Sequence, residues 1–239
     1  MDLLLTYVYM TKKYTELFQE MKELYIADPT YAVRSKKFIG LLEKRILNDI
    51  WESLSDKGKS ILRKEHEVEI FQDSKNKNVD IAIIDPSNGP LITIGVRSQM
   101  NSIAKNTLTY YQDIRGELAG LINRHPLSVH GYLYLHPKDI IKPDATDREK
   151  NEKINHHKYA KLFSTISGRG DANSITLNNP HLIRNCFDHF SYFVVDFKSN
   201  PIDYQDSWDD IDIDLSIDNF VDNIIKTSKD RLHFTGYFK

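Results

Sequence analysis

Cysteine is almost absent from this chain of 239 residues, in which Cys186 is the only one. This excludes an internal disulfide and a cysteine-ligated zinc site. The first residues, MDLLLTYVYMTKK, are apolar only briefly, carry an acid at Asp2 and lack a small-residue cleavage site. They are neither a secretion signal nor a membrane span. We therefore expect a cytoplasmic protein without a membrane partner.

Several sequence motifs are also missing. There is no Gly-x-Ser-x-Gly elbow of a serine hydrolase, no Gly-Lys-Ser/Thr of a phosphate-binding loop, and no glycine-rich loop for S-adenosylmethionine. The acidic run DDIDIDLS resembles the start of a calcium loop. However, Leu215 stands where that loop needs glycine and Val221 where it needs the closing acid, which excludes an EF-hand.

Basic residues are missing from one segment. Residues 199–225 contain eight Asp and no Lys or Arg, whereas the whole chain has 32 basic and 34 acidic residues and a formal charge of −2. The remainder therefore carries +6. A moderately basic body with an acidic appendage fits DNA binding, although an ordinary mixed surface with one acidic segment would give the same numbers.

The first residues are expected to be helical. Apolar side chains recur at alternating spacings of four and three, at Leu3, Tyr7, Met10, Tyr14, Leu17, Met21 and Leu24. A second helix is expected over residues 31–54, after a break at Asp28-Pro29. Residues 1–60 would thus form a helical N-terminal layer. The stripe on the first helix would pack either on the protein's own core or on a partner helix.

The apolar period then changes to that of strands. HEVEIFQ, NVDIAII and PLITIGVRSQ are predicted to form an antiparallel meander, followed by a helix over residues 107–124 and the strands VHGYLYLH and SYFVVDF. This order predicts an α/β (α+β) fold with a mixed central β-sheet flanked by helices. We expect a single domain over 1–239, with its core at 65–198 and an acidic segment and C-terminal helix at 199–239.

Two opposite charges interrupt the apolar strands of the meander. Asp80 lies within VDIAII and Arg97 within LITIGVRSQ. Burying such charges costs free energy unless they contact each other or a ligand. Because side chains alternate along a strand, Gly95, Arg97 and Gln99 are expected on one face. The pair is either a structural ion pair or part of a site.

These residues resemble the PD-(D/E)XK nuclease superfamily, which includes many type II restriction endonucleases. That family places an Asp on one strand and an acid-x-Lys triplet on the next. IGVRSQMNSIAKN and GYLYLHP are similar to one restriction-endonuclease subgroup. The resemblance implies a restriction-endonuclease-like fold with Asp80 as the metal-binding acid and Arg97 at the lysine position. Gly95 stands where the second acid should be.

Glu117 is the candidate replacement for that acid, because some restriction enzymes of this fold carry the acid on the following helix. GELAG places Gly116 and Gly120 one turn apart, and each glycine inside a helix costs about 1 kcal/mol relative to alanine. Close approach of helix and sheet would justify both glycines and would bring Glu117 near Asp80.

The expected chemistry is hydrolysis of a phosphodiester bond with Mg²⁺ as cofactor. Asp80 and Glu117 would hold the ion, with Val96 as a further contact. Arg97 stays protonated and would grip the phosphate, and Gln99 would orient water or phosphate. Further acids precede Asp80 on one face of a strand, at Glu67 and Glu69, and these are either additional ligands or solvated edge charges.

Candidate DNA contacts lie elsewhere in the chain. Phosphate contacts are expected from Lys75, Lys77, Lys105, Arg148, Lys150, Lys153 and Lys158. The loop SGRGDANS offers Arg169 and Asn173, residue types that pair with guanine and adenine, unless it is merely a surface loop. His156 and His157 are adjacent on a predicted helix and therefore do not converge on one metal.

We therefore expect a type II restriction endonuclease that cuts double-stranded DNA as a homodimer, with the cognate methyltransferase encoded separately. Three alternatives remain open. The first is a non-catalytic DNA-binding subunit that keeps the nuclease fold, the second is a repair or defence nuclease without site preference, and the third is an unrelated α/β structural protein.

Overall fold

The computed structural model describes residues 12–72, 76–140, 153–170 and 186–239. Their centre is a six-stranded sheet in the order β1-β2-β3-β4-β5-β6. Its strands are β1 (Arg63–Phe71), β2 (Asn76–Asp85), β3 (Gly89–Ser98), β4 (Val129–Pro137), β5 (His189–Asp196) and β6 (Asp203–Gln205). Strands β3, β4 and β5 are parallel, and the other neighbouring pairs are antiparallel. The expected mixed sheet and the β1-β2-β3 meander are confirmed.

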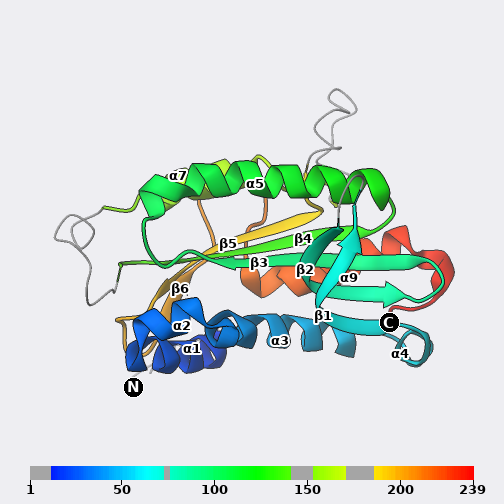
Figure 1. Cartoon of the computed structure of the whole chain (residues 1–239), viewed down its shortest axis with the longest axis horizontal. Helices are drawn as coiled ribbons and strands as arrows, with labels where there is room; N and C mark the ends of the chain where they lie inside the picture. The colour runs from blue at the N-terminus through cyan, green and yellow to red at the C-terminus, as the bar shows by residue number, and fades with distance from the viewer. Residues whose placement is uncertain (1–11, 73–75, 141–152, 171–185) are drawn as a thin grey trace, which may run out of the picture.

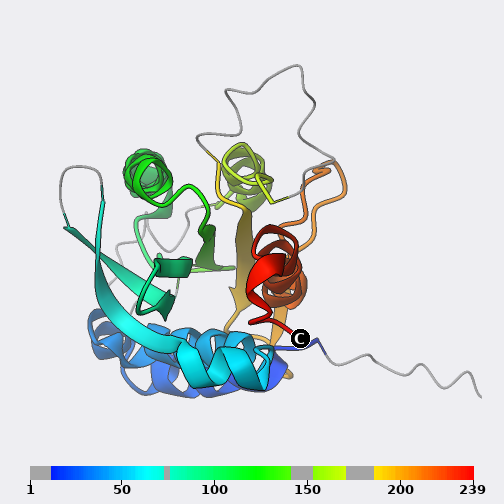
Figure 2. The ribbon, with the colours of Figure 1, turned by 90° about the vertical axis from the view of Figure 1, so that its right-hand side faces the viewer.

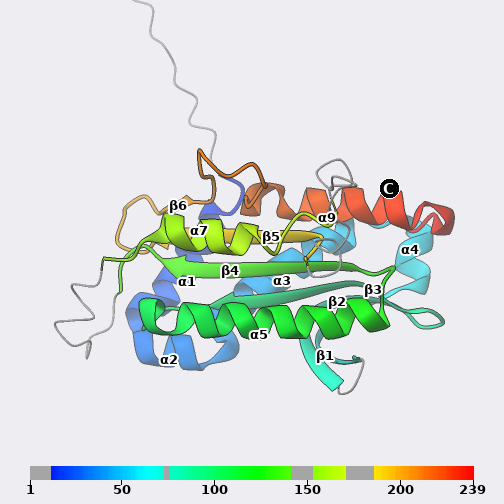
Figure 3. The ribbon, with the colours of Figure 1, turned by 90° about the horizontal axis from the view of Figure 1, so that it is seen from above.

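Helices cover both faces of the sheet. On one face lie α1 (Thr15–Ala27), α2 (Pro29–Arg34), α3 (Lys36–Glu52) and α9 (Ile217–Arg231), and on the other lie α5 (Ile103–Arg124) and α7 (His156–Ser164) (Figure 1). Seen from above, α5 and α7 run along the sheet, with α9 and the N-terminal helices behind it (Figure 3). In the described part of the chain, no helix combines the length and apolarity needed to cross a membrane.

The N-terminal layer differs in detail from expectation. The helix expected over 31–54 is interrupted at Ser35, whose backbone is extended (φ −85°, ψ 143°) between α2 and α3. Asp28 caps the start of α2 by accepting the N–H of Tyr31 at 2.8 Å. A short further helix, α4 (Asp56–Ile61), follows and was not predicted.

The heptad-like stripe falls partly outside the described residues. Within α1, Leu17 and Met21 are buried but Leu24 is 36% exposed, and Tyr25 takes its inward place. A straight helix has 3.6 residues per turn, so a stripe with a period of 3.5 drifts off the buried face. Phe18 also points inward and stacks on Phe193 of β5 at 5.6 Å between ring centroids. The described part of this apolar side therefore packs within its own chain.

The acidic segment is part of the sheet and its cover. It contains β6, which pairs with β5 and was not predicted, and it leads into α9. Residues of α1, α3, the central strands and α9 share one hydrophobic cluster on this face. A second cluster on the other face joins α5 and α7 to β4 and β5.

Side chains of β1 change the face of the sheet toward which they point at Glu67. Val68 and Val79 face Leu121 of α5, whereas His66, two residues before Val68, contacts Glu43 of α3. Side chains two apart on a regular strand would share a face. The change occurs at Glu67, whose φ is +54°. The outer end of this hairpin therefore bends around the sheet edge toward α5, as the view along the sheet shows (Figure 2).

Candidate active site

One cavity between the sheet and α5 brings the main predicted residues together. Asp80 of β2, Arg97 of β3 and Glu117 of α5 all line it, together with Lys77 and Tyr132. Its volume is about 130 Å³, enough for an ion with several waters. Two carboxylates and two cations from three separate elements thus surround one small polar space.

The position of Asp80 follows from the end of a strand pair. Pairing between β2 and β3 shifts register between Ile83 and Ile84 and ends at Ile81 and Ile94, and the next residues along are Asp80 and Gly95. There the strands part, and the Asp80 carboxylate accepts the main-chain N–H of Val96 at 2.7 Å. Val96 therefore lies beside the expected metal ligand and orients it.

The electrostatic surroundings of Asp80 are those of a buried acid. Burial raises the pKa of its carboxyl, and the Val96 N–H, Lys77 and Arg97 only partly oppose this, while Glu117 raises the pKa further. In the described residues, Asp80 makes no ion pair within 4 Å with a cation. A bound divalent ion would offset the free-energy cost of burying this negative charge.

Arg97 is held by aromatic rings. Its guanidinium carbon lies 4.3 Å from the centre of the Tyr110 ring on α5, and the side chain hydrogen-bonds Tyr132 of β4. The alternative of a direct interstrand ion pair with Asp80 is therefore wrong. The guanidinium remains a cation beside the cavity, half-buried and with donors left for a phosphate.

Glu117 reaches the cavity as expected but is held by a cation. Lys77 donates to its carboxylate at 2.5 Å, and Gln72 donates to the Glu117 carbonyl at 3.0 Å. Lys77 was predicted as a DNA phosphate contact. It lies instead inside the site, three residues before Asp80, where it neutralises Glu117.

The two helix glycines have different surroundings. A Cβ at Gly120 would lie 2.9 Å from Oε1 and 3.3 Å from Cβ of Gln72, so α5 approaches this side chain closely there and a larger residue would require Gln72 to shift. At Gly116 nothing lies within 4 Å, and the prediction that packing explains this glycine is wrong.

The side chain of Tyr132 explains why glycine and not an acid stands at position 95. Tyr132 was not among the predicted site residues. It lies opposite Gly95 in the parallel β3–β4 ladder, and a Cβ at Gly95 would meet its ring at 2.4 Å. The tyrosine ring thus occupies the space that an acidic side chain at this position would need. Glycine inside a buried strand is the sequence signal for such a close approach.

Gln99 does not belong to this cavity, so its predicted catalytic role is wrong. Its side-chain oxygen accepts from Tyr134 at 2.7 Å and from His136 at 3.1 Å. Its NH₂ group faces main-chain carbonyls, the nearest being Ser102 O at 3.1 Å. The regular strand ends at Ser98, so the alternation that placed Gln99 beside Arg97 no longer holds. Gln99 anchors the turn into α5.

Arg169 is not a surface residue that can contact bases, so this prediction is also wrong. Its side chain is only 10% exposed and lies 3.5 Å from the buried carboxylate of Asp188, and it donates to the carbonyl of Pro126. Asn173, its predicted partner, lies outside the described residues. The loop sequence alone gave no sign of the buried acid.

Apart from Lys77, the predicted phosphate contacts divide into two groups. Lys105 in the first turn of α5, Lys153 and Lys158 are exposed, as that role requires. The remaining three, Lys75, Arg148 and Lys150, lie outside the described residues. Glu69 is a solvated charge on edge strand β1, whereas Glu67 pairs with Lys36 of α3.

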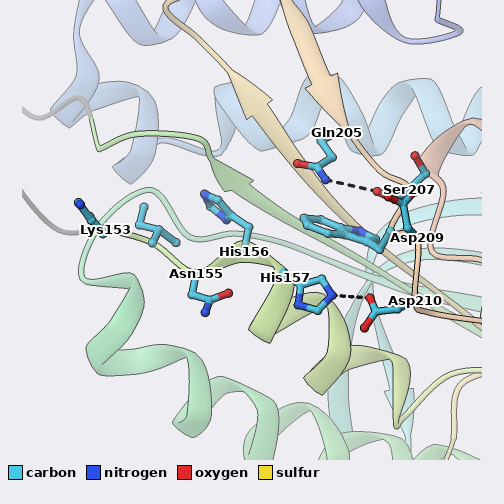
Figure 4. Close-up of a pocket in the computed structure, with 10 residues that line it drawn as sticks. Lys153, Asn155, His156, His157, Gln205, Ser207, Asp209 and Asp210 are labelled. Atoms are coloured by element: carbon cyan, nitrogen blue, oxygen red, sulfur yellow. Dashed lines mark hydrogen bonds and ion pairs between the residues drawn. The ribbon is translucent and has the colours of Figure 1, made fainter.

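A larger hollow lies at the start of α7, away from the site (Figure 4). His157 points across it to Asp210 of the acidic segment, which also pairs with Lys161 at 2.7 Å. His156 instead contacts the Tyr192 hydroxyl at 3.1 Å and the Lys138 carbonyl at 3.1 Å. The two rings therefore serve different partners, as their adjacency predicts.

Comparisons with known proteins leave the geometry as the main evidence. No protein-family model, no curated protein and no solved structure matches this chain.

Proposed function

We propose that this protein is a cytoplasmic, Mg²⁺-dependent endonuclease of the type II restriction kind, with a restriction-endonuclease-like fold, that hydrolyses double-stranded DNA as a homodimer. The observation that carries the proposal is the shared cavity of Asp80 and Glu117, with Arg97 and Lys77 on its wall. Partly buried acids beside partly buried cations in a small cleft are typical of catalytic sites.

The donor set fits a hard divalent cation. Asp80 and Glu117 offer carboxylate oxygens, and the partly buried Asp80 has no cation in ion-pair contact among the described residues. Val96 keeps Asp80 in place through its N–H. Such an ion, when bound, neutralises a scissile phosphate and acidifies a water molecule.

The cations have separate roles. Arg97 would hold two phosphate oxygens through its planar guanidinium, preoriented by the Tyr110 ring. Lys77 would exchange its contact with Glu117 for the phosphate, which frees the Glu117 carboxylate for the metal. Because a guanidinium stays protonated, Arg97 does not serve as the base that removes a proton from water.

The substrate and assembly rest on charge and symmetry. The body outside the acidic segment carries a formal +6, and Lys105, Lys153 and Lys158 are exposed for phosphate contacts. Cleavage of both strands at a symmetric sequence requires two equivalent sites, hence a homodimer. The cognate methyltransferase would be a separate chain.

A cleavage assay tests the proposal. Purified protein is incubated with plasmid in Mg²⁺ and, as a control, in EDTA. We expect discrete fragments from the wild type and intact plasmid with Asp80→Ala or Glu117→Ala, while DNA binding persists. Glu69→Ala, which removes an exposed acid outside the cavity, is the matched control and should cut normally. A smear would indicate a nuclease without site preference, and full activity of Glu117→Ala would exclude its proposed role.

A second candidate is a non-catalytic DNA-binding subunit. Two observations favour it: the Tyr132 ring fills the acid position at Gly95, and Lys77 already neutralises Glu117. This candidate predicts saturable, salt-sensitive DNA binding with intact plasmid at every metal condition.

A further inference from the structure

A second group of metal-ligating side chains lies on the α3 side of the sheet. Glu43 of α3 and the β1 residues His66 and Glu67 offer ligand atoms that all lie within 4.8 Å of one another. None of the three lines the cavity shared by Asp80 and Glu117. The group therefore lies outside that cavity, although the charge of Asp80 acts on Glu43.

Glu43 is an unusual residue for a helix packed on a sheet. It is only 3% exposed, and its carboxylate contacts His66 Nε2 at 2.5 Å. Burial raises its pKa, His66 opposes this, and the charges of Asp80 and Glu67 raise it further. Glutamate is almost never buried unless it is paired or bound to a metal. Its single strong partner here is an imidazole, itself a common metal ligand.

Glu67 reaches the group through an uncommon backbone conformation. Its φ of +54° is a left-handed value that residues other than glycine rarely adopt. The neighbouring pairs His66–Ile81 and Val68–Val79 put Glu67 level with Asp80 across the β1–β2 ladder. The Glu43, Glu67 and Asp80 carboxylates therefore share one neighbourhood.

Among the described residues, Lys36 is the cation that pairs with Glu67, whereas Lys77 and Arg97 act on Asp80. Lys36 pairs with Glu67, but its side chain is 75% exposed and can swing away into water. Glu43 and Glu67 thus keep a negative excess when Lys36 is counted, because two carboxylates face one ammonium group. A multivalent cation would balance this excess better than one ammonium group.

We propose that Glu43, His66 and Glu67 bind one divalent transition-metal ion, of the Zn²⁺, Co²⁺ or Mn²⁺ class. Metal–ligand bonds of about 2.0–2.2 Å place ligand atoms up to roughly 4 Å apart, so small side-chain shifts close the site. With one nitrogen and two oxygen ligands from the protein, the ion keeps coordination positions for water. The imidazole favours these ions over Mg²⁺, which prefers oxygen ligands. Lys36 leaves Glu67 on binding, and any proton on His66 Nε2 is released.

Cobalt binding tests this site without reference to cleavage. The full chain is titrated with Co²⁺ in excess Mg²⁺, which fills oxygen-only sites, and visible absorption is recorded. We expect one equivalent of Co²⁺ to bind the wild type, with at least tenfold weaker binding in His66→Ala and Glu67→Gln. The exposed Glu67 keeps the second variant folded, and circular dichroism verifies both. His233→Ala, which removes an exposed histidine elsewhere, should bind Co²⁺ normally.

Two outcomes would overturn the proposal: no saturable Co²⁺ spectrum in the wild type, or an unchanged spectrum and affinity in both folded variants. The proposal does not rest on the nuclease function. Glu117→Gln, in the other site, should leave the Co²⁺ spectrum unchanged while it removes cleavage. Failure of one site is thereby distinguished from failure of the other.

Discussion

The ring of Tyr132 lies directly against the backbone of Gly95. A Cβ at Gly95 would lie 2.4 Å and 2.7 Å from two ring carbons, closer than real side chains approach. The ring cannot move aside easily, because it stacks on Phe190 at 5.4 Å and contacts Phe187 at 5.3 Å between centroids. The contact with the Tyr132 ring therefore explains why position 95 is glycine, although the resemblance places an acid there.

Gly95→Ala should therefore destabilise the protein by about 1–3 kcal/mol, the usual cost of an overpacked core. Urea unfolding measures the change. Gly116→Ala is the matched control with the opposite expected sign: nothing lies within 4 Å of its Cβ, and replacing this helical glycine should stabilise by about 1 kcal/mol. A stabilising effect of Gly95→Ala would contradict this prediction and would show that the Tyr132 ring moves to accommodate the alanine Cβ.

Asp80→Asn should stabilise the metal-free protein at pH 7. Burial raises the pKa of Asp80, so folding with a charged carboxylate costs free energy, and asparagine can still accept the Val96 N–H. In the wild type this cost disappears as the pH falls through the raised pKa toward the ordinary value. The two proteins should therefore become equally stable in acid.

Asp85→Asn provides the contrast for that experiment. Hydrogen bonds from Asn88, Ser87 and Tyr237 outweigh desolvation and lower the pKa of Asp85. Its ionised form thus stabilises the fold, and Asp85→Asn should destabilise at pH 7, with the difference lost as the pH falls through the lowered pKa. Urea unfolding between pH 7 and pH 3 measures both variants, and parallel pH curves for them would contradict the assignment.

The sequence predicted the residues that local patterns can specify. A lone Asp80 in an aliphatic run and the alternation of β3 brought Asp80 and Arg97 to one cavity, whereas the spacing of GELAG held only at Gly120, since nothing lies close to Gly116. Tyr132 was missed because its contact with Gly95 depends on the register between parallel strands far apart in sequence. The position of Lys77 was predicted wrongly because a bend at Glu67 redirects the β1–β2 hairpin. No residue pattern in the sequence predicts the positive φ of that glutamate.

Arg169→Ala should reduce stability by about 1–3 kcal/mol and leave DNA recognition unchanged. Asp188 is fully buried and bonded to Arg231 at 2.6 Å and to the N–H of His130 at 2.7 Å, so Arg169 supplies a second positive charge to it. Lys105→Ala is the control, since this exposed side chain should affect DNA affinity and its salt dependence but not stability. Altered sequence preference in folded Arg169→Ala would restore its role as a base contact.

His130 should make the protein sensitive to mild acid. Its ring is fully buried between the Thr93 hydroxyl at 2.7 Å and the His125 carbonyl at 3.1 Å, partners that a neutral imidazole satisfies. Burial lowers its pKa to about 4, and Arg169 adds to this while Asp188 opposes it. Because the unfolded chain takes up the proton near pH 6.5, stability is full above that pH and falls as the pH drops toward 4.

The expected loss is roughly 3 kcal/mol between pH 6.5 and pH 4, since each pH unit in this window costs about 1.4 kcal/mol per histidine. Urea unfolding at a series of pH values measures it. His130→Gln should be less stable at pH 7 but show a shallower decline, whereas His233→Gln, at an exposed histidine, should keep the wild-type slope. His136 and His156, whose pKa values burial also lowers, contribute to the slope that remains. An equal slope in the wild type and His130→Gln would mean that His130 is charged in the fold, which its two neutral partners oppose.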